Sequence, residues 1–145
     1  MNVKEFFTKE QQSGIVQAIA DAEKATSGEI RVHLEKSCKD DVLDCAVFIF
    51  KKLKMHKTAL RNGVLIYLSV DDRKFAILGD VGINAKVPEG FWNQIKEIMI
   101  ANFSKGDFTS GLTEGIHMVG EKLKVYFPIM VDDTNELSNE ISFGS

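Results

Sequence analysis

The apolar run at residues 64–70 constrains the fold more than any other feature of the sequence. It consists of Val-Leu-Ile-Tyr-Leu-Ser-Val and follows the chain-breaking pair Asn62 and Gly63. Because polar and apolar residues do not alternate in it, the run is typical of a strand buried on both faces. We therefore expect it at the centre of a sheet that is covered by helices.

Two further strands are predicted from the sequence on either side of this run. In residues 29–35, aliphatic residues alternate with charged residues and His33. This alternation indicates a strand with one polar face near a sheet edge. After the central run, Asp71 and Asp72 form a short turn into residues 73–78, so these two strands are expected to pair antiparallel. The sheet is therefore predicted to be mixed.

Four helices, each with an apolar face, are predicted around the sheet. Thr8 begins a capping box for the first, and two aspartates at 40–41 place negative charge at the start of the second. Pro88 suits the first turn of the third, and Asp107 is a natural N-cap for the fourth. The sequence thus predicts an α/β domain with a small mixed sheet and about four helices.

The last helix and the C-terminal residues carry two further expectations. Gly111 and Gly115 are expected to allow close packing against the sheet, because glycine costs a helix roughly 1 kcal/mol relative to alanine. Residues 132–145 are polar and lack capping residues, so we expect a flexible tail that buries no apolar face. The single folded domain is then expected to span residues 1–131.

The charge and hydropathy of the chain exclude two classes of partner. The net charge is −3 and the isoelectric point is about 5.6, with Lys and Arg scattered along the chain, which argues against nucleic acid. No stretch approaches the roughly 18 apolar residues of a membrane span, and the first residues do not form a signal peptide. The sequence predicts a cytoplasmic protein without a membrane anchor.

The cysteine pattern predicts neither a zinc site nor a disulfide. Cys38 and Cys45 are the two cysteines of the chain, and they form no CxxC motif. Cys45 falls on the apolar face of a predicted helix, where it is expected to be a small core residue. Cys38 falls in a predicted loop and is expected to be an exposed free thiol.

Four short segments form an ordered set that is more specific than any one of them. They are Ser-Gly-Glu-Ile-Arg-Val at 27–32, Arg-Asn-Gly-Val-Leu-Ile at 61–66, Asp-Asp-Arg-Lys at 71–74 with Gly-Asp-Val-Gly-Ile at 79–83, and Phe-Ser-Lys-Gly-Asp-Phe at 103–108 with Gly111 after it. Together they resemble the TPM domain family, often labelled TPM phosphatase. The resemblance implies a three-layer α/β/α sandwich and, for some members, a divalent metal site and acid phosphatase activity. Residues 85–88, Ala-Lys-Val-Pro, stand where the family usually places Leu-Thr-Asp.

The predicted topology places three aspartates at one edge of the sheet. The carboxyl ends of the two parallel strands should meet there, next to Asp71 and Asp72. The third helix should then return the chain to the same edge at Asp107. Carboxylates in loops are ligands for Ca²⁺ or Mg²⁺, so these three residues are the predicted metal site. Each also has a structural explanation, because Asp71 and Asp72 suit a turn and Asp107 suits an N-cap.

A second polar cluster is expected at the opposite edge of the sheet. Glu29, Arg61, Asn62 and Asp80 should lie there, with an ion pair between Arg61 and either Glu29 or Asp80. Glu29 and Asp80 are secondary candidates for binding a metal. The spacing of the glycines near Asp80 does not match a P-loop or a dinucleotide-binding motif.

Three functions follow from the sequence as alternatives. The first is a TPM-like domain that binds Ca²⁺ or Mg²⁺ at an acidic loop edge. The second is a metal-assisted acid phosphatase, in which the cation polarises a phosphoryl oxygen and activates water. The third is a protein-interaction module with structural carboxylates. Nucleophilic catalysis has little support, because the chain has no GxSxG motif and its three histidines fall in separate predicted elements.

Overall fold

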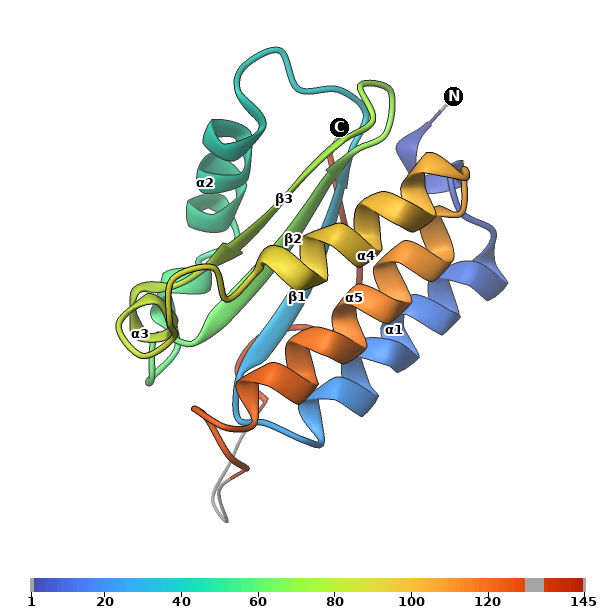
Figure 1. The fold of residues 1–145 in the computed structure, drawn as a ribbon. Coiled ribbons are helices and arrows are strands. Elements are labelled where there is room, and N and C mark those ends of the chain that lie inside the picture. Colours follow the sequence, from blue (N-terminus) through green and yellow to red (C-terminus); the bar gives the residue numbers. More distant parts are fainter. Residues whose placement is uncertain (1, 130–134, 145) are drawn as a thin grey trace.

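The computed structural model describes residues 2–129 and 135–144. Figure 1 shows three layers, with α2 on one face of the sheet and α1, α5 and α4 side by side on the other. The helices are α1 (Lys9–Glu23), α2 (Val42–Lys52), α3 (Val81–Asn84), α4 (Asn93–Ser104) and α5 (Phe108–Leu123). The strands are β1 (Glu29–Glu35), β2 (Gly63–Ser69), β3 (Lys74–Gly79) and β4 (Ser142–Phe143), and two 3₁₀ turns are η1 (Val3–Glu5) and η2 (Met55–Lys57). The expected α/β/α sandwich is confirmed, and the short α3 is an addition to it.

The sheet has the strand order β3-β2-β1-β4. β1 is parallel to both β2 and β4, whereas β2 and β3 are antiparallel, so the predicted mixed sheet is confirmed. Every residue of β2 is buried, as its apolar sequence predicted. The expectation that β1 lies near a sheet edge is confirmed, because it is next to the edge strand β4. The expected wet face is wrong, because both Glu29 and His33 are buried.

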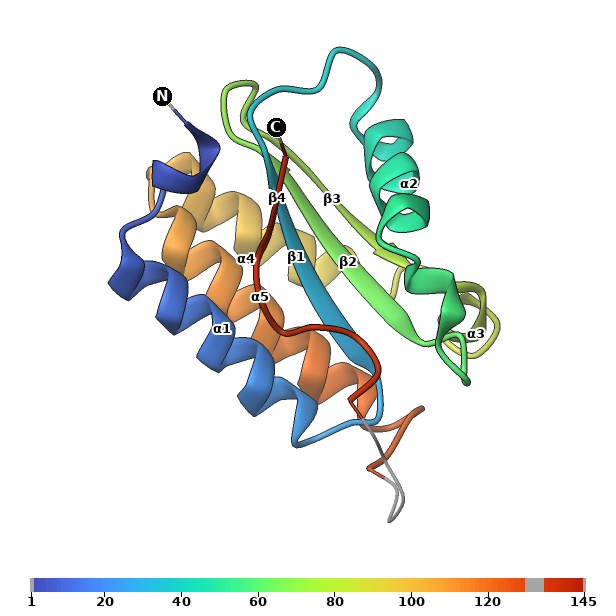
Figure 2. The ribbon, with the colours of Figure 1, turned by 180° about the vertical axis from the view of Figure 1, so that it is seen from behind.

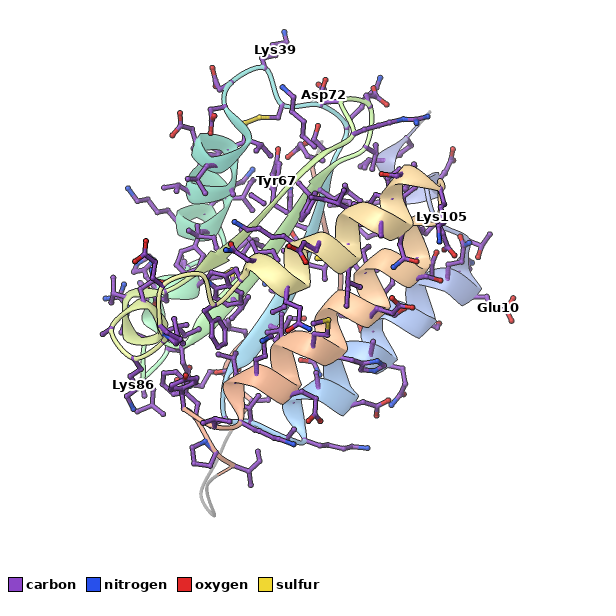
Figure 3. The ribbon with its side chains drawn as sticks, viewed as in Figure 1. Glu10, Lys39, Tyr67, Asp72, Lys86 and Lys105 are labelled. Atoms are coloured by element: carbon purple, nitrogen blue, oxygen red, sulfur yellow. A yellow bond between two sulfur atoms is a disulfide. The ribbon has the colours of Figure 1, made fainter. Side chains whose placement is uncertain are left out.

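Two apolar cores fill the space between the layers. The larger core joins one face of the sheet to α1, α4 and α5, and it contains Ile30, Val32 and Leu34 of β1. The smaller core joins the other face to α2 and includes Tyr67, which lies between α2 and the sheet in Figure 3. The Tyr67 ring stacks on His33 with the ring centroids 5.7 Å apart. The polar face of β1 is therefore on the α2 side of the sheet.

The helix starts follow the predicted capping residues in three of four cases. Thr8 and Gln11 form the expected capping box, Asp41 accepts a hydrogen bond from the Leu43 amide, and Asp107 accepts one from the Ser110 amide. The fourth prediction is wrong, because α4 begins at Asn93 rather than at Pro88. Gly90, between them, has a φ of +78°, a left-handed conformation that cannot continue a right-handed helix.

The glycines of α5 allow close contacts with helices rather than with the sheet. A Cβ atom at Gly115 would lie 2.7 Å from the Met99 sulfur of α4, and one at Gly120 would lie 2.8 Å from the Ala22 Cβ of α1. A Cβ at Gly111 would overlap the Phe103 ring of α4. The expected packing of Gly111 and Gly115 against the sheet is therefore wrong, and α5 instead packs tightly between its two neighbouring helices.

The C-terminal residues return to the sheet. Figure 2 shows the last residues running beside β1, where the Gly144 amide donates to the Leu34 carbonyl at 2.8 Å. Ile141 is buried in the larger core. The expectation that residues 132–145 bury no apolar face is wrong for residues 135–144, because β4 pairs with a strand far away in the sequence. Residues 132–134 lie outside the described part of the chain.

The two cysteines form a disulfide, which corrects the sequence prediction. Cys38 and Cys45 are joined with their Cα atoms 6.4 Å apart, and Cys38 is buried rather than exposed. The loop between β1 and α2 folds back over the first turn of α2, and this return brings the two sulfurs together.

None of the described helices is long and apolar enough to cross a membrane.

Candidate functional site

The structure gives Asp72 and Asp107 structural partners. Asp72 accepts hydrogen bonds from the Cys38 amide at 2.6 Å and from the Ser69 hydroxyl at 2.7 Å. These bonds lower the pKa of the Asp72 carboxyl, the Cys38 amide more than the Ser69 hydroxyl. Asp107 accepts from the Ser110 amide at 3.1 Å, and this bond lowers the pKa of Asp107. Both carboxylates therefore hold loops in place.

The predicted aspartate site is not assembled in this structure. Asp71 is exposed beside Asp72 in the β2–β3 turn, whereas Asp107 follows Lys105 in a separate loop, and Figure 3 shows these two loops apart. Among residues 2–129 and 135–144, no three His, Cys, Asp or Glu side chains are placed to hold a metal ion. Cation binding by these three aspartates stays a prediction.

At the opposite edge of the sheet, the Asp80 carboxylate forms an ion pair with Arg61. Arg61 donates to its two oxygens at 2.7 Å each, and the Val81 amide donates to it at 2.7 Å, so that Asp80 also caps α3. Of the two partners expected for Arg61, the structure therefore selects Asp80 and leaves Glu29 free of this arginine. Asp80 has little capacity left for a metal ion.

Glu29 lies at the start of β1 and is 4% exposed. Its Oε1 atom accepts a hydrogen bond from the Leu137 amide at 2.6 Å, which ties the C-terminal segment to the sheet. Burial raises the pKa of Glu29 to about 7, although the hydrogen bond from Leu137 lowers it in part. The carboxylate is therefore held away from water with an amide donor as its partner.

A second glutamate, Glu23 at the end of α1, lies beside Glu29. It accepts a hydrogen bond from the Ile30 amide at 2.9 Å, and burial raises its pKa to about 7. The negative charge of Glu23 contributes to the raised pKa of Glu29. The ionised form of Glu23 thus disfavours ionisation of Glu29.

Both glutamates line one small cavity, which we call the glutamate cavity. Its volume is about 140 Å³, and its walls are formed by Glu23, Thr26, Ser27, Gly28, Glu29, Ile129 and Asn135. Ser27 is 7% exposed, and its hydroxyl oxygen is buried without a hydrogen-bond partner among the described residues. Within the same residues, no Lys, Arg or His forms an ion pair with either glutamate. The cavity therefore combines two uncompensated carboxyl groups with an unpartnered hydroxyl.

Sequence reasoning found Glu29 as a secondary candidate but missed Glu23 and Ser27. Glu23 closes the first predicted helix six residues before Glu29, at the turn that joins that helix to the next strand. A turn of this length places both carboxyl groups at one edge of the sheet. No signal in the sequence indicates that these glutamates are shielded from water, because the residues that cover them, Asn135 and Leu137, lie more than 100 residues away in the sequence.

Comparison with known proteins identifies the family. The sequence model of the TPM domain matches residues 2–122, which excludes the C-terminal segment that closes the glutamate cavity. The chain is similar to the BA42 protein of the psychrophilic bacterium Bizionia argentinensis, known from an NMR structure, with 50% identity over 98% of each chain and a TM-score of 0.92. No functionally curated protein matches the sequence.

Two more distant solved structures support the fold alone. One is the N-terminal domain of a protein from P. gingivalis, at 21% identity over 83% of this chain and 78% of that one, with a TM-score of 0.69. The other is the N-terminal domain of cg2496 from Corynebacterium glutamicum, at 13% identity over 97% and 82%, with a TM-score of 0.65. With the family match over most of its length, the chain belongs to the TPM domain family.

Proposed function

We propose that this TPM domain binds a divalent cation, Ca²⁺ or Mg²⁺, in the glutamate cavity. The observation that carries the proposal is the pair of carboxyl groups of Glu29, which is buried, and Glu23, which is partly buried. No cationic side chain among residues 2–129 and 135–144 forms an ion pair with either of them. Buried charges in proteins are paired or coordinate metals, because an uncompensated one is costly. A divalent cation would compensate both carboxylates at once.

The cavity offers the oxygen donors that a hard cation takes. In addition to the two carboxylates, the cavity contains the Ser27 hydroxyl, which has no hydrogen-bond partner among the residues that the structure describes, and Asn135 lines the same walls. Ca²⁺ takes six to eight oxygen ligands and Mg²⁺ keeps several waters, so water would complete the coordination in either case. A volume of about 140 Å³ has room for an ion with a few waters, each of which occupies roughly 30 Å³.

The same volume favours cation binding over phosphatase activity at this position. Sites for small organic molecules usually measure ~300–1,000 Å³. A phosphomonoester bound beside the cation would extend out of a cavity of about 140 Å³. Phosphate release from a generic monoester in the presence of Mg²⁺, compared with chelator, tests the hydrolase alternative directly.

The first test is metal-dependent stability. At pH 8, Ca²⁺ or Mg²⁺ at a hundredfold excess over its Kd should raise the free energy of unfolding by about 2.7 kcal/mol, because the ion binds the folded state alone. Glu23→Gln with Glu29→Gln should abolish most of this gain, since it removes both charges and keeps the amide acceptors. Thermal or urea unfolding with and without EDTA measures the effect.

The double variant Asp71→Asn with Asp72→Asn is the matched control, because it removes two charges at the other edge. It should keep the full gain from the cation, and NMR shifts on titration should appear at Ser27 and Ile30 rather than at Asp107. Loss of the gain in this control, with retention in the glutamate variant, would move the site to Asp71, Asp72 and Asp107. Absence of any effect at millimolar cation would leave the interaction module as the function.

The second test is the pH dependence of stability without metal. The pKa values of Glu23 and Glu29 are about 7 in the folded protein and near 4.3 in an unfolded chain. Between these pKa values the folded state binds more protons than the unfolded state does. The contribution of the two glutamates to stability is therefore fully present below about pH 4.3 and is lost as the pH rises through 7. After allowance for solvent screening, we expect a loss of about 1–2 kcal/mol in EDTA.

Chemical unfolding at several pH values measures this loss, with Glu29→Gln as the comparison. His33 acts in the opposite sense, because burial lowers its pKa and stability then rises with pH up to about 6.5. The difference between wild type and Glu29→Gln isolates the glutamate contribution. If the difference in the free energy of unfolding between wild type and Glu29→Gln were the same at pH 5 and pH 8, the raised pKa of Glu29 would be contradicted.

A further inference from the structure

A second cavity lies at the same end of the sheet as the glutamates, next to α2, and no step of the proposed function uses it. It is found where α2 ends, next to η2, the end of β3 and α3, and its volume is about 560 Å³. We call it the α2–β3 pocket and define it by Phe50, Lys51, His56, Arg61, Leu78 and Val81. Its volume is within the range usual for small organic ligands.

One wall of the α2–β3 pocket is apolar. Phe50 of α2 and Leu78 of β3 contribute side chains to it, and Val81 at the start of α3 is 58% exposed. An exposed valine beside a leucine and a phenylalanine leaves apolar surface in contact with water. A ligand with an apolar body would cover this surface and gain hydrophobic free energy.

The rim of the pocket carries an excess of positive charge. Asp80 is the one acidic side chain that lines it, and Arg61 and the Val81 amide already donate to both of its oxygens. Lys51 is exposed and forms no ion pair within the described ranges 2–129 and 135–144. Arg61 uses two N–H groups on Asp80 and so keeps three donors for another acceptor.

His56 adds a polar group to the same wall. Its Nδ1 atom is buried and has no hydrogen-bond partner among the residues that the structure describes. Buried polar atoms are usually paired, so this nitrogen is expected to pair with water or with a ligand atom. The pocket therefore joins an apolar wall to a polar rim that favours anions.

We propose that the α2–β3 pocket binds a small amphiphilic carboxylate. The apolar body of the ligand lies on Phe50, Leu78 and Val81, and its carboxylate pairs with Lys51 and with the free N–H groups of Arg61. Charge complementarity selects an anion, and the mostly apolar wall selects one with a hydrocarbon chain or ring. Octanoate is the probe of this chemistry, with 1-octanol as a neutral ligand of the same chain and acetate as an anion without the chain.

The test is an NMR titration of the full chain with the three compounds. Octanoate should shift the amides of Gly79 and Val81 saturably, and it should bind at least about threefold more tightly than 1-octanol, as expected for one partly exposed ion pair. Acetate should cause no saturable shift at the same concentration. Equal binding of octanoate and 1-octanol, or absence of saturable binding at millimolar octanoate, would overturn the proposal.

Two lysine variants distinguish a local contact from the overall charge. Lys51→Gln should weaken octanoate about threefold, whereas Lys52→Gln should leave it unchanged, because Lys52 lines a different cavity with His33 and Tyr67. Val81→Asp should weaken octanoate about tenfold or more, because it places a like charge in the apolar wall. An equal loss in both lysine variants would show that net charge alone attracts the ligand and would overturn the assigned site.

Discussion

A chain that ends at Ile129 is expected to be about 3 kcal/mol less stable than the full chain. The missing residues include Ile141, which is buried in the larger core, and burial of an isoleucine side chain contributes about 1.5–3 kcal/mol. They also include the amides of Leu137 and Gly144, which donate to Glu29 and Leu34, at about 1 kcal/mol per bond. The entropy of ordering the segment offsets part of this sum.

Thermal unfolding measures the effect as a decrease in Tm of about 10 °C, given the usual few degrees per kcal/mol at this chain length. Ile141→Ala in the full chain should reproduce roughly half of the loss or more, since it removes the buried side chain but keeps the backbone bonds. Glu140→Gln, at an exposed neighbouring position, should change stability by less than about 0.5 kcal/mol. An unchanged Tm after truncation would mean that the segment does not pack on β1 in solution.

Gly82→Ala should cost about 3 kcal/mol or more. A Cβ atom at Gly82 would overlap the Leu60 carbonyl oxygen and would lie 2.6 Å from that of Arg61. These are backbone atoms, and the Gly82 amide donates to the Arg61 carbonyl at 2.9 Å, so the two segments cannot separate without losing that bond. Overpacking of this kind usually costs 1–3 kcal/mol, and a shift of α3 would also disturb the Arg61–Asp80 ion pair, so we expect ~3 kcal/mol.

Gly14→Ala is the matched control for this substitution. Gly14 lies in α1, and a Cβ there would meet no atom within 4 Å. Alanine in a helix is more favourable than glycine by about 1 kcal/mol, so the same chemical change should stabilise the protein at this position. Urea unfolding of both variants gives the two free energies. Similar effects of the two substitutions would contradict the close contact between α3 and the 60–61 backbone.

The parts of the fold that depend on neighbouring residues could be predicted from the sequence. The apolar run of β2, the Asp71–Asp72 turn and the capping box of Thr8 each depend on residues that are adjacent or one helical turn apart. Together with the alternation of residues 29–35 and the caps at Asp41 and Asp107, these features predicted three strands and the starts of three helices. The helix start predicted at Pro88 was wrong because Gly90, two residues later, has a left-handed conformation that overrides the local preference of proline for the first turn of a helix.

The candidate site could be predicted only in part, because its environment comes from distant residues. The alternation of residues 29–35 placed Glu29 on the polar face of β1, but the covering segment at Leu137 lies 108 residues away. The three predicted aspartates had local explanations as turn and cap residues, and Asp72 and Asp107 have these roles in the structure. The disulfide depends on a loop that folds back on α2, for which a spacing of seven residues gives no signal.

The pairing of β4 with β1 joins residues that are much further apart in the sequence than those joined by the pairing of β1 with β2. β1 and β2 pair Glu29 with Gly63, 34 residues apart, whereas His33 and the Ser142 side chain meet across 109 residues. By loop-closure entropy alone, the longer closure costs about 1 kcal/mol more. The two-residue β4 also gains fewer contacts in return than β2 does. Opening of β4 alone is therefore the least costly disruption of the sheet, and it removes the Ser142 hydroxyl from His33 while β1, β2 and β3 remain paired.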